Sequence, residues 1–378
     1  MAKRRRANSE GSIYQRKGGT WEAKITLPDG KRKSIYARSQ GALLDKLQDV
    51  RKRMADGLPP SPAKLTVKEW LETWLRDSVA HSVRPRTAHR YTEIVRYHLT
   101  PNLGHLKLSR LTPTDVERMI SKVLAAGQSP QSAAHHRAVL RTALNHAMRH
   151  DLIGRNAASL ASAPYVPEKE HDAISPDKAR AILQAVKGDT LEALYLLLLS
   201  TGLREGEALG LRWDDVSLED GTASVRRTLQ RTDGEWTFPE PKTKRSRRTM
   251  SLPGPVVAAL RKHHVHQLEQ RLRLGPAWEG EKWGLLVFTT EVGSPLHSTT
   301  VLHRFQKLLE RAGLPRMRIH DLRHGAASLM AAMGIPPRVA MEMLGHSQIA
   351  TTMNIYAHVA PEYGKEAMER VSKVLWGG

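Results

Sequence analysis

Four separate stretches in the C-terminal half of the chain carry cationic, imidazole and phenol side chains that can act on an anion. In the first, residues 201–211, Arg204 follows a glycine break and Glu207 follows Arg204 by three positions. If Arg204 opens a helix, Glu207 lies on the same helix face and can hold it in place. A guanidinium fixed in this way presents a planar pair of donors to two phosphate oxygens. This stretch therefore predicts a phosphate-binding arginine.

The second stretch, residues 238–250, is dense in Lys and Arg and follows an alternating run that turns at residues 233–234. We place Lys242 in a loop between two strands. Lysine can give up a proton when neighbouring cations lower its pKa, whereas arginine cannot. Lys244 is so close that either lysine could act, and a general phosphate-binding loop is the alternative interpretation.

The third stretch, residues 318–324, places His320 and Arg323 on one face of a predicted helix. His320 and His324 have the spacing of zinc ligands on a helix, but a metalloprotease helix needs Glu at the position that Asp321 occupies. We therefore expect no metal. Helix-capping or core histidines are the alternative interpretation of this motif taken alone.

The fourth stretch runs from residue 343 to Tyr356. Gly345 is expected to end a helix, which puts His346 on a turn at its mouth. Tyr356 stands ten residues later beside polar neighbours, which is unusual for a core tyrosine, although a single tyrosine is more often structural. The chain contains no cysteine, so any nucleophile must be oxygen or nitrogen. Together the four stretches fit phosphoryl transfer.

Composition predicts a polyanionic partner. The 378 residues include 59 Lys and Arg against 38 Asp and Glu, a formal net charge of +21, and the pI is near 10.3. Nucleic acid is the first candidate, because each neutralised phosphate releases counterions, and an anionic membrane surface is the second. The lack of cysteine excludes disulfide scaffolds, Fe–S clusters and Cys-ligated zinc.

Hydrophobic patterning predicts neither a membrane span nor a secretory signal. The most apolar segment, residues 191–199, is about half as long as the roughly 20 residues that a span needs, so it predicts a buried helix. The basic run at residues 3–6 is not followed by the apolar stretch of a secretory signal. We therefore expect a cytoplasmic protein.

Two stretches rich in proline or small residues, 57–63 and 157–170, are expected to be interdomain linkers. They divide the chain into three predicted domains, residues 1–63, 64–167 and 168–378. The excess positive charge is concentrated in the first two domains, whereas the third is nearly balanced. This distribution predicts that the front of the chain holds the polyanion.

The first predicted domain is a small three-stranded sheet backed by one helix. Strand-like runs cover residues 12–16, 21–27 and 32–37, and apolar spacing predicts a helix over residues 39–54. Basic and aromatic side chains on the strands suit a sheet face laid into a DNA groove, and a solvated basic face is the alternative. These side chains are Tyr14, Trp21, Lys24, Arg32, Lys33 and Tyr36.

The second predicted domain is all-helical. Its helices are expected over residues 65–76, 87–98, 113–126 and 130–149. Thr112, followed by Pro113 and Asp115, is a good helix start, and Trp70 and Trp74 are expected in the core. Arginines recur along the helix faces and could clasp a duplex, although charged faces are usually only solvated. The candidates are Arg84, Arg86, Arg90, Arg137 and Arg141.

The ordered set of residues in the four stretches resembles the active site of the tyrosine recombinases, the phage-integrase family. The set is Arg204, Lys242, His320, Arg323, His346 and Tyr356, within the motifs LREGE, HDLRH and LGH and a following tyrosine. Gly325 departs from the family, which often has Thr there. The resemblance covers the whole chain. It implies a multidomain, mainly α fold with small β sheets: an arm-binding domain, a helical core-binding (SAM-like) domain, and a mixed α+β catalytic domain with a C-terminal tail helix.

The resemblance also implies roles in catalysis. Tyr356 would attack a DNA phosphodiester to form a 3′-phosphotyrosyl ester, which conserves the bond energy, so neither ATP nor a cofactor is needed. Arg204 and Arg323 would clamp the nonbridging oxygens. His320 and His346 would add hydrogen bonds. Lys242 would protonate the leaving 5′-oxygen, and the supporting and phosphate-contacting residues would be Glu207, Lys244 and Arg247.

The implied function is site-specific DNA recombination that integrates, and also excises, a phage or mobile element. The implied partners are double-stranded DNA at core-type and arm-type attachment sites, three further copies of the chain in a tetramer, an excision factor and a host DNA-bending protein. The tail after Pro361 could dock on a neighbouring subunit or on its own domain. The alternatives are a type IB topoisomerase and a non-catalytic DNA-binding regulator.

Overall fold

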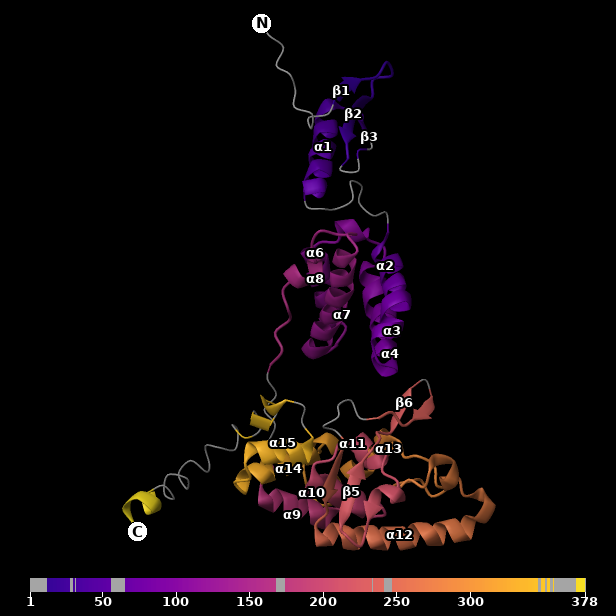
Figure 1. Ribbon diagram of the computed structural model, residues 1–378, viewed down its shortest axis with the longest axis vertical. Helices are drawn as coiled ribbons and strands as arrows, with labels where there is room; N and C mark the ends of the chain where they lie inside the picture. Colours follow the sequence, from indigo (N-terminus) through magenta and orange to yellow (C-terminus); the bar gives the residue numbers. More distant parts are fainter. Residues whose placement is uncertain are drawn as a thin grey trace. The chain divides into compact units, whose positions relative to one another are not determined.

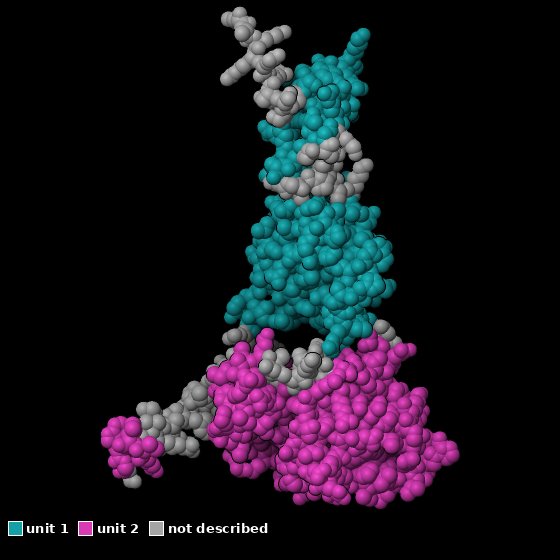
Figure 2. Space-filling model, viewed as in Figure 1, with its two compact units in different colours: residues 1–169 teal, residues 170–378 magenta. Residues whose placement is uncertain are grey.

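The computed structural model describes residues 12–27, 30, 32–55, 65–167, 174–232, 234–240, 247–345, 348–350, 352–353, 356 and 372–377. Contacts within the chain divide it into two compact units, residues 1–169 and 170–378 (Figure 2). Helices predominate, and the described residues form three small antiparallel sheets. This confirms the mainly helical fold class, while the three-domain division at residues 63 and 167 stays a prediction.

The N-terminal part of the first unit is an antiparallel meander covered on one face by a helix (Figure 1). Its elements are β1 (Ser12–Gln15), β2 (Trp21–Thr26), β3 (Arg32–Ala37) and α1 (Gln40–Ala55). Ala23, Ile25 and Ile35 point toward Leu43 and Leu47 of the helix and form a small core. Because side chains alternate along a strand, the residues between them face away from α1.

Two long helices interrupted by π turns and three further α-helices form the rest of the first unit, as far as the structure describes it. Residues 67–82 comprise α2 (Val67–Trp74), η1 (Leu75–Val79) and α3 (Ala80–Ser82), and residues 85–103 comprise α4 (Pro85–Ile94), η2 (Val95–Leu99) and α5 (Thr100–Leu103). The remaining elements are η3 (Leu108–Arg110), α6 (Pro113–Ala125), α7 (Pro130–Arg149) and α8 (Ala157–Leu160). Both long helices extend beyond their predicted ends at residues 76 and 98, because a π turn continues each of them.

Local sequence signals in this helical part are confirmed. The Thr112 hydroxyl accepts the Asp115 N–H at 3.2 Å, and the Asp115 carboxylate accepts the Thr112 N–H at 3.1 Å, a reciprocal cap at the start of α6. Trp70 and Trp74 are buried, and the Trp70 indole N–H donates to the Ala143 carbonyl of α7 at 3.0 Å. These contacts tie α2 to α7.

The second unit surrounds the apolar helix α10 (Glu192–Thr201) (Figure 1). Its other helices are α9 (Pro176–Ala185), α11 (Glu205–Leu209), α12 (Gly254–Leu274), α13 (Ser298–Arg311), α14 (Ile319–Ala332) and α15 (Pro337–Leu344), with short 3-10 turns η4 (Trp213–Asp215), η6 (Gly275–Ala277) and η7 (Gly280–Trp283). The helix α10 (Glu192–Thr201) packs against α12 on one side and α14 on the other, which confirms the predicted buried helix.

Two small sheets lie within the second unit. The order β4-β5-β8 is antiparallel, with β4 (Val216–Ser217), β5 (Thr222–Val225) and β8 (Arg248–Ser251), and a separate hairpin pairs β6 (Gln230–Thr232) with β7 (Glu235–Thr237). Among the residues that the structure describes, no helix is long and apolar enough to cross a membrane.

Candidate active site

Arg204 is held at a sharp turn between two helices. The helix α10 ends at Gly202, whose φ of +64° is a left-handed conformation that favours glycine, and Arg204 caps the next helix, α11. The Arg204 Nη1 donates to Glu207 Oε1 at 2.6 Å, and the Arg204 backbone N–H donates to Glu207 Oε2 at 3.1 Å. The predicted hold of Glu207 on Arg204 is therefore confirmed.

Arg323 reaches the same turn from α14. Its side chain is buried and its Nη1 donates to the Gly202 carbonyl. Within the described structure its Nη2 is buried without a hydrogen-bond partner. Burial lowers the pKa of Arg323, and the nearby Arg204 lowers it further. An arginine stays protonated even so, which leaves a buried cation with an open donor.

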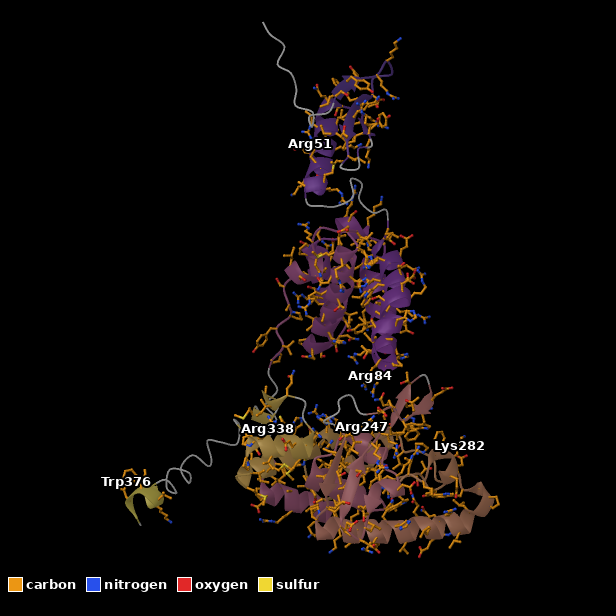
Figure 3. All side chains as sticks on the ribbon, viewed as in Figure 1. Arg51, Arg84, Arg247, Lys282, Arg338 and Trp376 are labelled. Atoms are coloured by element: carbon orange, nitrogen blue, oxygen red, sulfur yellow. The ribbon has the colours of Figure 1, made fainter. Side chains whose placement is uncertain are left out.

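Arg248, at the start of β8, completes a cluster of three guanidinium groups and is absent from the residues predicted from the sequence. Its Nη2 donates to Glu207 Oε2 at 3.2 Å and its Nε donates to the Met343 carbonyl at 2.9 Å. The predicted neighbour, Arg247, instead lies exposed and pairs with Glu240 (Figure 3). The alternation of side chains along a strand could have distinguished Arg247 from Arg248, because successive side chains point to opposite faces.

The end of α15 also meets this cluster. Gly345 ends the helix in a left-handed conformation with φ of +67°, as predicted, and its carbonyl accepts from Arg204 Nη2 at 3.2 Å. His346 follows directly in the chain but lies outside the described residues, as do Lys242 and Lys244. Their roles stay predictions.

His320 lies one turn before Arg323 on α14, and its ring meets His324 edge to face, with 4.9 Å between ring centroids. His320 is exposed, yet enough protein surrounds the ring that desolvation lowers its pKa to about 4, with repulsion from His324 and Arg323 in the same direction. Asp321 caps the helix by accepting the Arg318 N–H at 2.7 Å. No group of three His, Asp or Glu side chains that could hold a metal occurs in the part of the chain that the structure describes.

Tyr356 packs beside α14 and α15, against the small cluster of Ala326, Met330 and Leu344. Its hydroxyl donates to the carbonyl of Ile335, in the turn between the two helices, at 2.8 Å. Burial raises the pKa of this phenol. In this arrangement the phenol is a neutral hydrogen-bond donor to the backbone.

The predicted DNA-contacting side chains of the N-terminal sheet do not share one face. Tyr14, Lys24, Arg32 and Tyr36 point away from α1, and the Lys24 ammonium lies 5.7 Å from the centroid of the Tyr14 ring. Trp21 and Lys33 alternate with them and lie on the face that α1 covers. The open face also holds Glu22, whose buried carboxylate accepts from Arg16 at 2.6 Å.

The predicted arginines of the helical part differ in their surroundings. Arg84 (Figure 3), Arg86, Arg90 and Arg141 are exposed. Arg90 donates to the His135 ring at 3.1 Å. Arg137 is instead partly buried, and its Nη2 donates to the carbonyl of Ala161 at 2.7 Å, which fastens the segment after α8 onto α7. Its contacts in the structure are therefore those of a structural residue.

Comparison with known proteins places these sites in a family. A family model described as "Phage integrase family" matches residues 172–363, and one described as "Phage integrase, N-terminal SAM-like domain" matches residues 66–124. The chain belongs to the phage integrase family. This integrase is 32% identical to an integrase of Streptomyces ambofaciens, covering 94% of each chain. It is 29% identical to a "Tyrosine recombinase XerC-like" protein of Caldanaerobacter subterraneus, covering 91% of this chain and 92% of the relative.

Solved structures share the fold of this integrase. The Tn1549 transposon integrase in complex with transposon right-end DNA has a TM-score of 0.71 at 21% identity, over 82% of this chain and all of that one. A lambda integrase tetramer bound to a Holliday junction has a TM-score of 0.57 at 20% identity, over 93% and 96% of the two chains. The predicted family is therefore confirmed, and the fold is that of tyrosine recombinases.

Proposed function

We propose that this integrase cleaves and rejoins DNA through a 3′-phosphotyrosyl ester on Tyr356. The observation that supports it most directly is the meeting of Arg204 and Arg323 at Gly202. One guanidinium is fixed by a buried carboxylate, and the other has an open, buried donor. A phosphate between them would accept hydrogen bonds that the protein itself does not satisfy within the described residues. Such donors stabilise a phosphorane more than the diester, because the phosphorane carries more charge on its nonbridging oxygens.

The cationic site would also favour ionisation of the nucleophile, the Tyr356 phenol. A phenol with a pKa near 10 is ionised only about one part in a thousand at pH 7, a deficit of about 4 kcal/mol. Cations beside the phosphate can offset that deficit when the phenol reaches them. For attack, Tyr356 has to release the Ile335 carbonyl, which costs about 1 kcal/mol of net hydrogen bonding.

The remaining steps follow the chemistry of the diester. Lys242 protonates the leaving 5′-oxygen, with Lys244 as a phosphate contact, and His320 and His346 donate to the nonbridging oxygens. The 5′-hydroxyl of a partner strand then attacks the ester, expels the phenol and restores a diester. The bond broken and the bond formed are both phosphate esters, so no ATP or cofactor enters.

The front of the chain would hold the DNA. Residues 1–63 would bind arm-type sites, with the open sheet face of Tyr14, Lys24 and Arg32 toward a groove, and residues 64–167 would bind the core-type site. Two sequential exchanges need four copies of the chain, and a DNA-bending host protein and an excision factor would assist. The reaction would take place in the cytoplasm of a prokaryotic cell, on the nucleoid.

A suicide substrate tests the proposal. A duplex nicked beside the cleavage site traps the covalent intermediate, because the short fragment that carries the freed 5′-hydroxyl diffuses away and cannot reverse the reaction. We expect a protein–DNA adduct with the wild type and none with Tyr356→Phe, with DNA binding retained. An adduct in Tyr356→Phe would disprove the nucleophile. Joining of ends from two different duplexes distinguishes recombination from topoisomerase relaxation, which reseals the same strand, and from binding alone.

A further inference from the structure

Arg248 is a nearly buried guanidinium to which the proposed chemistry gives no role. Its side chain is 9% exposed, and it reaches Glu207 on α11 and the Met343 carbonyl on α15, far apart in sequence. Burial lowers the pKa of Arg248, and Glu207 opposes that shift. A buried cation is costly to keep, so its placement calls for a reason beyond packing.

The first effect of Arg248 concerns the charge on Arg204. The Glu207 carboxylate is shared, since Oε1 accepts from Arg204 Nη1 and Oε2 accepts from Arg248 Nη2. One negative charge therefore pairs with two guanidinium groups. Arg204, Glu207 and Arg248 together keep a net positive charge. Without Arg248, Glu207 would act on Arg204 alone and draw that guanidinium away from a phosphate.

The second effect concerns the end of α15. Arg248 holds the Met343 carbonyl, and Arg204 holds the Gly345 carbonyl two residues on. A Cβ at residue 345 would lie 2.6 Å from Arg248 Nη1, so a side chain there would displace that guanidinium, and the positive φ of residue 345 also favours glycine. His346 continues the chain from this point.

We propose that Arg248 is a positioning residue for DNA cleavage. It orients Arg204 through Glu207 and fixes the end of α15 through Met343, and it does not contact the reacting phosphate. The inference rests on the proposed function, because it assigns Arg204 to the scissile phosphate. It adds a residue from β8 to Arg204 and Arg323, which helices position.

Single-turnover cleavage of the suicide substrate at saturating DNA measures the effect. We expect Arg248→Met to form the adduct about 100-fold more slowly, the size of loss that misplaced catalytic groups produce, while its Kd for DNA stays within about threefold. Arg248→Lys should recover part of the rate, because it restores the charge without the fork. Arg180→Met removes an exposed arginine paired with Asp177 on α9 and serves as the matched control, with an unchanged rate.

A second variant, Gly345→Ala, tests the same position of the Arg248 guanidinium. Its Cβ should displace the Arg248 guanidinium, so it should also slow cleavage, and the double variant with Arg248→Met should be slower by less than the product of the two effects. Wild-type cleavage by a folded Arg248→Met would overturn the inference. If that variant does not fold, wild-type cleavage by Gly345→Ala would overturn it instead. A wild-type protein that forms no adduct would contradict the proposed function rather than the role of Arg248.

Discussion

Replacing Glu207 with glutamine tests how the arginine cluster is held together. The Glu207 side chain is 3% exposed and accepts from Arg204 Nη1, from the Arg204 backbone N–H and from Arg248 Nη2. Glutamine has the same shape, but its amide NH₂ turns a donor toward one guanidinium, and the negative charge is lost. The buried guanidinium of Arg248 and the partly exposed guanidinium of Arg204 then lie near each other without a counterion.

The size of the effect follows from burial. Removing one partner of a buried ion pair typically costs 3–5 kcal/mol, and glutamine keeps one accepting oxygen, so we expect about 3 kcal/mol. For a unit of this length each kcal/mol lowers the melting temperature by about 2–4 °C, so the transition of residues 170–378 should fall by about 6–12 °C.

The same substitution should have a distinctive pH dependence. Burial raises the pKa of Glu207, but Arg248 and Arg204 outweigh it and the pKa lies below the ordinary value of 4.5. A carboxylate with a lowered pKa stabilises the fold above its unfolded pKa, and that stabilisation is lost as the pH falls through the folded value. The difference in stability between wild type and Glu207→Gln should therefore have its full size at pH 7 and become smaller below about pH 4.

Differential scanning calorimetry of the full chain at pH 7 and at a pH below about 4 is the assay. Glu342→Gln is the matched control, because Glu342 forms an exposed pair with Arg338 on α15, and such pairs contribute little. It should shift the transition by no more than about 2 °C. Equal melting of Glu207→Gln and wild type at pH 7 would refute the idea that this carboxylate neutralises the cluster.

Two further predictions concern α10 and α14. Gly202→Ala should destabilise the second unit by at least about 2 kcal/mol, because the φ of residue 202 is positive and a Cβ there would lie 2.3 Å from Leu344 Cδ2. Chemical denaturation measures this loss, and a loss below about 0.5 kcal/mol would contradict the prediction. His320→Gln should make stability less sensitive to pH between 6.5 and 4, because burial lowers the pKa of the folded His320 to about 4 and the unfolded chain binds the proton first. Parallel pH profiles of urea unfolding for the variant and wild type would show that His320 titrates normally.

Spacing along one helix made part of the site predictable. Arg204 and Glu207 stand three residues apart, so the hold of one on the other follows once a helix is expected there. Glycines at 202 and 345 mark the ends of helices for the same local reason. The meeting of Arg204 with Arg323 could be expected only through the family resemblance, because it depends on the packing of α14 against α10.

Two interpretations depended on which face of a strand is covered, and sequence alone does not decide this. On β8 the basic run offers Arg247 and Arg248 as neighbours, and only the packing of α11 and α15 turns Arg248 inward. On the N-terminal sheet the position of α1 sends Trp21 and Lys33 to one face and Lys24 to the other. The number of basic residues in a strand does not indicate which face of the sheet each one occupies.

The arginine cluster holds three like charges close together, and neutral acceptors account for most of its hydrogen bonds. Glu207 supplies one negative charge, and the carbonyls of Gly202, Met343 and Gly345 accept three of the guanidinium N–H groups. These neutral acceptors satisfy hydrogen bonds without cancelling charge, so the cluster stays positive. Within the described residues the buried Nη2 of Arg323 has no acceptor. Under the proposed function, a phosphate would supply both the negative charge that the carbonyls lack and the acceptor that Arg323 lacks, so its binding would relieve the repulsion among the guanidinium groups.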